Sequence, residues 1–166
     1  MRRVGCAVLF GVALVAGTSD AAGHLSSLDD EQAVKESFEA FQAAIKAKDA
    51  EKLWGLLDSD SRDDAERAAK AIKAAYAKAS AEQKAEMAKK LGLSGDELAK
   101  LTGSGFLKTK RFHGKYHEVP DSKIEKITVQ GNAAKVYYVE EDGDKETMKL
   151  VRQDGRWKLT VPMPQK

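Results

Sequence analysis

The sequence predicts an α+β fold, in which N-terminal helices pack on a curved four-stranded antiparallel meander with a cone-like shape. In the first half, apolar residues recur at spacings of three and four behind capping residues, which is typical of amphipathic helices. In the second half, apolar and polar residues alternate between turn-forming glycines that stand twelve residues apart, Gly131, Gly143 and Gly155. This change of period indicates helices followed by strands.

The first helix is expected to begin after Ser27 and to end near Lys48, with acidic residues in its first turn. Its apolar stripe comprises Val34, Phe38, Phe41 and Ile45. A short second helix should follow Asp49, and it is apolar on nearly every side, which is typical of a helix buried between larger elements. We expect Trp54 to be buried there as a wedge, and Gly55 to permit close approach of another backbone segment.

Three further helices are predicted from pairs of residues with the spacing of a capping box. The pairs are Ser61 with Asp64, Ser80 with Gln83, and Ser94 with Glu97. The inner stripe of the third helix comprises Ala65, Ala68, Ile72, Tyr76 and Ala79. Gly92 can end the fourth helix, and the fifth should end near Leu101.

The strands are predicted to form hairpins with a defined register. A two-residue turn at Asp154 and Gly155 pairs Leu150 with Leu159. Around Gly143, a three-residue loop is favoured over a two-residue loop, because it keeps the apolar side chains on one continuous face. That face would carry Val136, Tyr138, Met148, Leu150, Trp157, Leu159 and Val161.

The N-terminus has the three-part pattern of a secretory signal peptide over residues 1–23. Two arginines precede an apolar run, and Ala21 and Gly23 have the spacing that signal peptidase prefers. The run is shorter than the about 20 apolar residues of a membrane span, so we predict cleavage and export to the periplasm or the medium. An uncleaved membrane anchor is the alternative. Cys6, the one cysteine, lies inside this signal, so the mature chain would have no disulfide and no thiolate ligand.

Residues 24–166 are long enough to form a single domain with its own core. The chain has 28 basic and 26 acidic residues, and this near balance argues against general nucleic-acid binding. The expected core comprises Phe38, Phe41, Trp54, Leu57, Ile72, Met148, Leu150, Trp157 and Leu159.

Two segments carry a resemblance to a known family. Residues 49–57 have the pattern Asp-x-Glu-x-Leu-Trp-x-Leu-Leu, and in the final hairpin, residues 153–161, a glycine precedes a basic residue and a tryptophan. In this order the chain, over residues 29–163, resembles the nuclear transport factor 2-like (cystatin-like α+β cone) superfamily, and especially its small exported bacterial members of uncharacterised function. The resemblance implies a pocket between the helices and the concave sheet, used by isomerases, dehydratases, hydrolases or non-catalytic binding domains. Residues 80–118 depart from the family as a helical and basic insertion.

A basic, aromatic segment over residues 106–117 is the first candidate site, since it carries four cations and two histidines and no acidic residue. It could bind an anionic ligand; the alternative is a solvated segment anchored by Phe106, Leu107 and Phe112. The candidate ligand-binding residues are Lys108, Lys110, Arg111, His113, Lys115 and His117, with Tyr76 and Tyr138 as candidates to line a pocket.

No metal site, cofactor or catalytic set is predicted. His113 and His117 have a helical spacing, but only Glu118 lies near them as a carboxylate. The sequence has no phosphate-binding loop, dinucleotide fingerprint or Ser-His-Asp order. Helix capping explains an acidic cluster that lacks the spacing of an EF-hand loop, Asp58, Asp60, Asp63 and Asp64.

The sequence is compatible with three hypotheses of function. The first is an exported, non-enzymatic domain that binds a small molecule or an extracytoplasmic protein, with homodimer formation as a further option and membrane contact only through an uncleaved signal. The second is an isomerase-, dehydratase- or hydrolase-like enzyme with a buried acid or tyrosine in the cavity. The third is binding of anionic material through residues 106–117. A concave face that is filled by side chains would count against the second.

Overall fold

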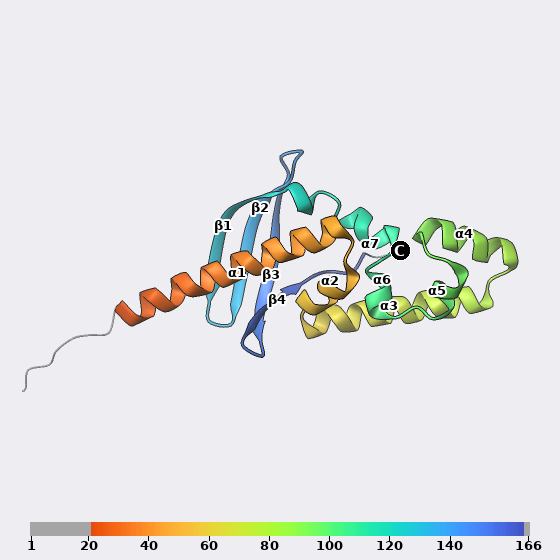
Figure 1. Ribbon diagram of the computed structural model, residues 1–166, viewed down its shortest axis with the longest axis horizontal. Helices are drawn as coiled ribbons and strands as arrows, with labels where there is room; N and C mark the ends of the chain where they lie inside the picture. Colours follow the sequence, from red (N-terminus) through yellow and green to blue (C-terminus); the bar gives the residue numbers. More distant parts are fainter. Residues whose placement is uncertain (1–20, 165–166) are drawn as a thin grey trace, which may run out of the picture.

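The computed structural model describes the backbone of residues 21–164 and the side chains of residues 28–164. Helix α1 (Ala21–Ala47) lies across one face of the sheet, and the molecule is elongated because α3 (Ser59–Lys78), α4 (Ala81–Leu91) and α5 (Gly95–Ala99) extend beyond the end of the sheet (Figure 1). The other helices are α2 (Ala50–Leu56), α6 (Gly103–Phe106), α7 (Lys110–Lys115) and the 3₁₀ turn η1 (Val119–Asp121). The predicted α+β class is confirmed. Residues 1–20 of the predicted signal lie outside the described part, so its cleavage stays a prediction.

The sheet is an open antiparallel meander in the order β1-β2-β3-β4. Its strands are β1 (Lys123–Gln130), β2 (Ala133–Val139), β3 (Lys145–Gln153) and β4 (Arg156–Thr160). Leu150 pairs with Leu159 in the predicted register. At the middle hairpin the backbone N–H of Glu140 donates to the carbonyl of Asp144 at 2.9 Å, which leaves the expected three residues in the loop.

The core lies between α1 and the face of the sheet that carries the predicted apolar side chains. Phe38 on α1 meets Tyr138 on β2, with their ring centroids 5.1 Å apart. Apart from Trp54, the predicted core residues are at most 7% exposed. Phe38 and Leu159 are fully buried. The alternation of β-strand side chains therefore places one continuous apolar face under α1.

Two predicted helix starts are wrong. Helix α1 begins at Ala21, so Ser27 is not its N-cap. Helix α3 is capped by Asp58, whose Oδ1 accepts from the backbone N–H of Ser61 at 2.8 Å. Ser61 is instead buried inside α3, and its Oγ accepts from the backbone N–H of Val161 at 2.8 Å. Asp58 takes the cap because it is the residue with extended backbone before the first turn.

The other capping predictions are confirmed. Asp49 caps α2, and Ser80 and Ser94 begin α4 and α5 in capping boxes with both reciprocal hydrogen bonds. Gly92 ends α4 with a φ of 71°, in the left-handed region that glycine adopts without steric cost. Helix α5 ends at Ala99, slightly earlier than expected. Among the described helices, none combines the length and the apolarity that crossing a membrane requires.

The surroundings of α2 differ from the expectation. Trp54 is half-buried and packs at the edge of the core, with the guanidinium carbon of Arg62 5.5 Å from its ring centroid. Gly55 is exposed, and a Cβ placed there would have no atom within 4 Å. The predicted close approach at Gly55 is therefore wrong. Its carbonyl does accept from Lys158 Nζ at 2.5 Å, which any residue at this position could do.

Replacing Gly55 with Ala should raise the free energy of unfolding by about 0.5–1 kcal/mol, because glycine costs that much in a helix interior and the new methyl group meets nothing. Urea unfolding followed by circular dichroism measures the change. A less stable Gly55→Ala protein would mean that the fold requires the absence of a side chain at this position.

Candidate functional site

The basic segment over residues 106–117 is anchored from inside. Phe106, Leu107 and Phe112 are fully buried. Phe112 lies 5.1 Å from Tyr116 between ring centroids, and the Tyr116 hydroxyl donates to the carbonyl of Pro162 at 2.5 Å. The apolar residues of the segment thus join α6 and α7 to the core and to the C-terminal chain. This is the anchoring that the sequence left as an alternative.

The cations of this segment do not form one site. Lys108 lines a pocket between α5 and α6, whereas Arg111 lines a separate hollow of about 450 Å³ against α3. Lys115 donates to the carbonyl of Pro162 at 3.1 Å. The aliphatic carbons of Lys110 lie against Gly92. Because these side chains point to different surroundings, their charges do not converge on one anion.

The two histidines are also separated by their environments. His117 is exposed and its Nε2 lies 3.0 Å from a carboxylate oxygen of Glu118. His113 is half-buried beside Phe112, and its Nε2 has no hydrogen-bond partner among the described residues. Burial, and then the nearby charge of Lys48, lowers the pKa of His113, so the ring is neutral at pH 7.

The expected pocket between the helices and the sheet is filled. The inner sheet face carries Val136, Met148, Leu150, Trp157 and Leu159, all at most 5% exposed. Tyr138, a candidate pocket residue, is 4% exposed and packs on Phe38. Burial raises the pKa of Tyr138 far above its ordinary value, and the charges of nearby glutamates add to this effect. A tyrosine in this state keeps its proton at neutral pH, so Tyr138 is a core residue and a poor proton donor.

Tyr76, the other tyrosine candidate, lies on the helical side of the molecule. It is half-buried on α3, with the ammonium of Lys84 5.5 Å from its ring centroid. Its hydroxyl lies where a side chain on Gly95 would be. It therefore packs against the start of α5, and its contacts are different from those of Tyr138.

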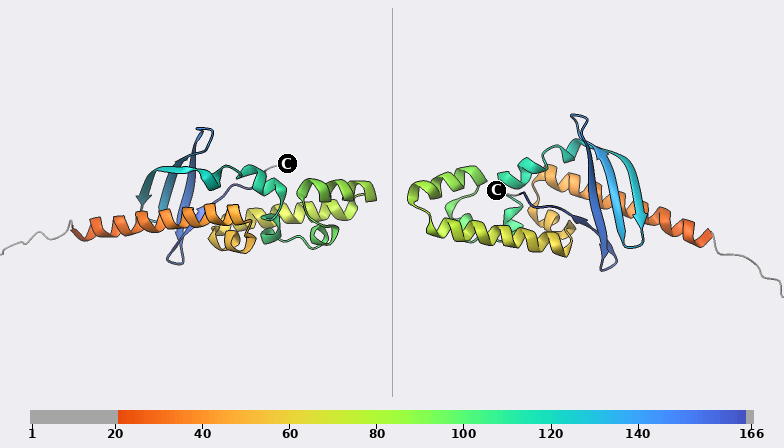
Figure 2. Two further views of the ribbon diagram at one scale, coloured as in Figure 1. Left: turned by 45° about the horizontal axis from the view of Figure 1, so that its top comes forward. Right: turned by 180° about the vertical axis from the view of Figure 1, so that it is seen from behind.

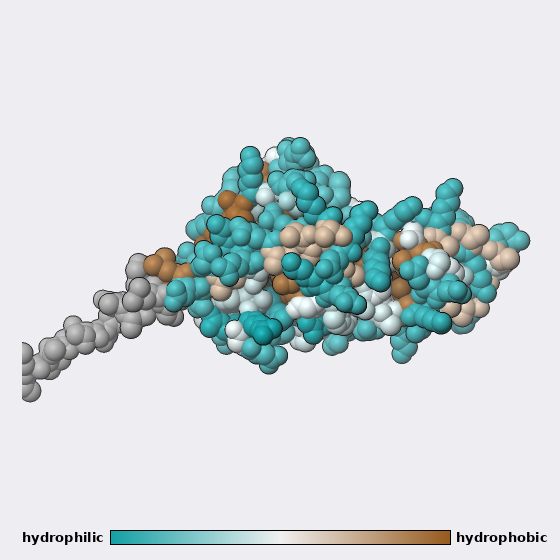
Figure 3. Space-filling model, viewed as in Figure 1, coloured by the Kyte–Doolittle hydropathy of each residue, from teal (hydrophilic) through white to brown (hydrophobic). Residues whose placement is uncertain are grey.

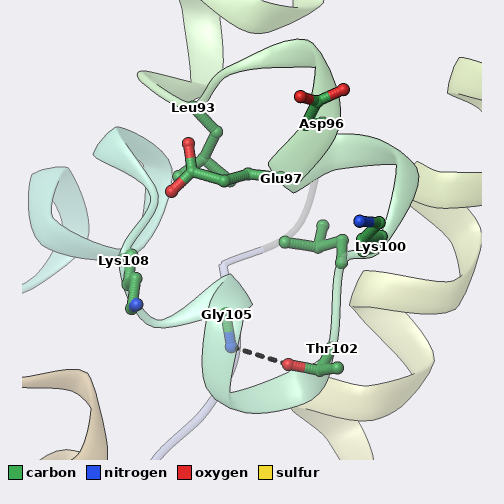
Figure 4. A pocket seen from close by; sticks show the side chains of 8 residues that line it. Leu93, Asp96, Glu97, Lys100, Thr102, Gly105 and Lys108 are labelled. Atoms are coloured by element: carbon green, nitrogen blue, oxygen red, sulfur yellow. Dashed lines mark hydrogen bonds between the residues drawn. The ribbon is translucent and has the colours of Figure 1, made fainter.

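A further hollow is the α5–α6 pocket, defined by Leu93, Asp96, Glu97, Lys100, Leu101, Thr102, Gly105 and Lys108. Its volume is about 360 Å³, within the range of small-molecule sites. Leu93 and Leu101 are less than 10% exposed and give it an apolar lining. Apolar side chains lie over α4 and α5, as they also do over part of α1, on a largely hydrophilic face (Figure 3). In Figure 4, Glu97 lies between Leu93 and Lys108 on one side of the pocket.

Local capping positions the polar groups of the α5–α6 pocket. Glu97 accepts from the backbone N–H of Ser94 at 2.7 Å, which fixes its carboxylate at the start of α5. Those hydrogen bonds from Ser94 lower the pKa of Glu97, and the charge of Lys108 lowers it further, so Glu97 is ionised at neutral pH. At the other end, Thr102 caps α6 by accepting from the backbone N–H of Gly105 at 3.1 Å (Figure 4). The pocket thus presents two carboxylates, Asp96 and Glu97, and two ammonium groups, Lys100 and Lys108, beside an apolar surface.

Carboxylates gather at one place that the sequence did not indicate. Glu118, Glu140 and Asp142 bring one carboxylate oxygen each within 4.8 Å of one another. Burial and the neighbouring Glu118 raise the pKa of Glu140. Three such oxygens are fewer than the six to eight that Ca²⁺ takes, so this cluster alone is an incomplete calcium site.

The acidic cluster noted in the sequence, Asp58 to Asp64, does not form one site in the structure either. Asp58 is buried as the cap of α3, and Asp64 forms an ion pair with Arg67. Asp60 and Asp63 are exposed on the first turns of α3. These residues act through capping and local charge pairs.

Comparisons with known proteins leave the family open. No family model, no curated protein and no solved structure matches this chain. The resemblance to the nuclear transport factor 2-like superfamily therefore stays a prediction, and the site has to be interpreted from its own chemistry.

Proposed function

We propose that this protein is a non-catalytic binding domain that takes a small zwitterionic ligand in the α5–α6 pocket. The ligand class is a hydrophobic amino acid or a short peptide. The N-terminal pattern makes export part of this proposal, with binding outside the cytoplasm. The observation that supports it most is the placing of Glu97 and Lys108 beside the apolar lining of one pocket.

The filled inner face favours binding over catalysis. The enzyme hypothesis requires a cavity with a buried acid or base within reach of a substrate. At that position the inner sheet face and α1 are packed together, and Tyr138 lies against Phe38. The α5–α6 pocket holds charged groups at its surface, among them Glu97, whose pKa is lowered by its hydrogen bonds from Ser94. Such groups suit charge recognition better than proton transfer.

The pocket chemistry matches a zwitterion in three respects. Lys108 can donate to a carboxylate, and the Glu97 oxygen that does not contact Ser94 can accept from an ammonium group. Leu93 and Leu101 can cover an apolar side chain. The volume of about 360 Å³ accommodates a ligand of dipeptide size.

Titration of the ¹⁵N-labelled protein with leucine and with the dipeptide Leu-Leu tests this function. We expect ligand-dependent shifts of the amide signals over residues 93–108. The affinity derived from them should be roughly tenfold lower in Lys108→Gln, because a charge-assisted hydrogen bond contributes about 1.5 kcal/mol. The matched control is Lys89→Gln on α4, an exposed lysine that does not line the pocket.

Two results would contradict the proposal. One is the absence of shifts over residues 93–108 with either probe. The other is equal weakening in Lys89→Gln, which would indicate a general charge effect. Spectra of the unlabelled probe, recorded after prolonged incubation, show whether it is chemically altered; any turnover would favour the enzyme hypothesis instead.

A further inference from the structure

The outer face of the sheet is an open basic surface. Helix α1 covers the inner face, and the view from behind shows the strands in front of α1 with no helix over them (Figure 2). The strand registers place Lys126, Lys135 and Lys149 on this outer face, together with Tyr137. We call these four residues the basic sheet face.

Two of its lysines stand directly opposite each other. Lys135 on β2 pairs with Lys149 on β3, and both are exposed. Side chains in such a pair are about 5 Å apart at Cβ, so like charges there destabilise a sheet. None of the ion pairs among residues 28–164 involves Lys126, Lys135 or Lys149. The charges are therefore left uncompensated at a cost to the fold.

The surface around this pair is hollowed, and polar side chains stand in the hollow among apolar ones. The hollow has a volume of about 290 Å³, and its lining contains no carboxylate. It is lined by Thr128, Gln130, Ala133, Ala134, Lys135, Tyr137, Lys149, Leu150, Val151 and Thr160. Glu125, an acidic residue of β1, lies at the far end of the sheet and is bound to Lys145 at 3.0 Å. Hydroxyl and amide groups between uncompensated cations are suited to a ligand that carries both hydroxyls and anions.

We propose that the basic sheet face binds a linear anionic polysaccharide. Lysine is a compact point charge that suits single carboxylate or sulfate groups, whereas arginine predominates where phosphates are bound in a bidentate way. The face has one aromatic side chain, Tyr137, and binding of single-stranded nucleic acid needs a row of aromatic rings for base stacking. Thr128, Gln130 and Thr160 supply hydrogen bonds for sugar hydroxyls. This surface is separate from the α5–α6 pocket, so the inference does not depend on the proposed function.

The test is retention and direct binding of the full chain on heparin and on polygalacturonate, with single-stranded oligo(dT) as a third probe. We expect the Lys135→Gln/Lys149→Gln protein to bind both polysaccharides roughly tenfold more weakly, since two exposed charges are lost. Its unfolding midpoint should stay the same or rise, because a repulsive pair is removed. The matched control is Lys70→Gln/Lys73→Gln, which removes two exposed lysines from α3.

Each outcome of this experiment either supports or overturns the proposal. A selective loss in the sheet variant with an intact control supports the proposal. Absence of binding by the unaltered protein, or equal loss in the α3 control, overturns it. Tighter binding of oligo(dT) than of either polysaccharide, lost in the same sheet variant, also overturns it and assigns the face to nucleic acid.

Discussion

Replacing Phe38 with Ala is expected to lower the free energy of unfolding by about 3–5 kcal/mol. Phe38 is fully buried at the centre of α1 and packs on Tyr138 across the interface between helix and sheet. The shortened side chain would leave a cavity in the layer that joins α1 to the sheet, and the neighbouring residues can fill it only in part. Since most domains are stable by about 5–15 kcal/mol, the loss removes a large share of the total. Urea unfolding followed by circular dichroism at 222 nm measures it.

Trp54→Ala provides the comparison for Phe38→Ala. Trp54 is larger than Phe38 but only half-buried, so its removal should cost about half as much as a fully buried aromatic side chain. An equal or greater loss at Trp54 would contradict the burial in the structure. If Phe38→Ala is too unstable to purify, Phe38→Leu keeps most of the volume, and its smaller loss can be measured in the same way.

The strand register could be predicted because it depends on local chemistry. A two-residue turn at Asp154 and Gly155 fixes which residues face each other, and alternation then fixes the face of every side chain on both strands. The start of α3 could not be predicted in this way, since several residues from Asp58 to Ser61 are able to cap a helix. What decides between them is the contact of Ser61 with Val161, which is 100 residues away in the sequence.

The candidate sites were predicted less well, for a physical reason. The local density of positive charge over residues 106–117 suggested one anion-binding site, but neighbouring residues of short helices point to different surroundings. The opposition of Lys135 and Lys149 follows from the predicted register of the middle hairpin, so register arithmetic could have found the basic sheet face. The α5–α6 pocket could not be found from sequence, because Glu97 has a sufficient explanation as a capping residue.

Replacing Asp58 with Ala should cost about 2–4 kcal/mol of unfolding free energy, the second large effect. Asp58 is 3% exposed, and its carboxylate makes two hydrogen bonds, one within the first turn of α3 and one to β4. Oδ1 caps α3 through Ser61, and Oδ2 accepts from the hydroxyl of Thr160 at 2.6 Å. Beside it, the backbone N–H of Asp58 donates to the carbonyl of Leu159 at 3.0 Å, so the start of α3 is fixed to β4. Loss of the carboxylate leaves buried donors without an acceptor.

Asp60→Ala is the matched control for Asp58→Ala, because Asp60 is exposed in the first turn of the same helix and contributes only through the helix dipole. Its cost should be a few tenths of a kcal/mol. Thr160→Val, measured alone and together with Asp58→Ala, isolates the contact between helix and strand: the two losses should add to more than the loss of the double variant. Equal costs for Asp58→Ala and Asp60→Ala, or strict additivity with Thr160→Val, would show that Asp58 acts as a local cap and does not fix α3 to the sheet.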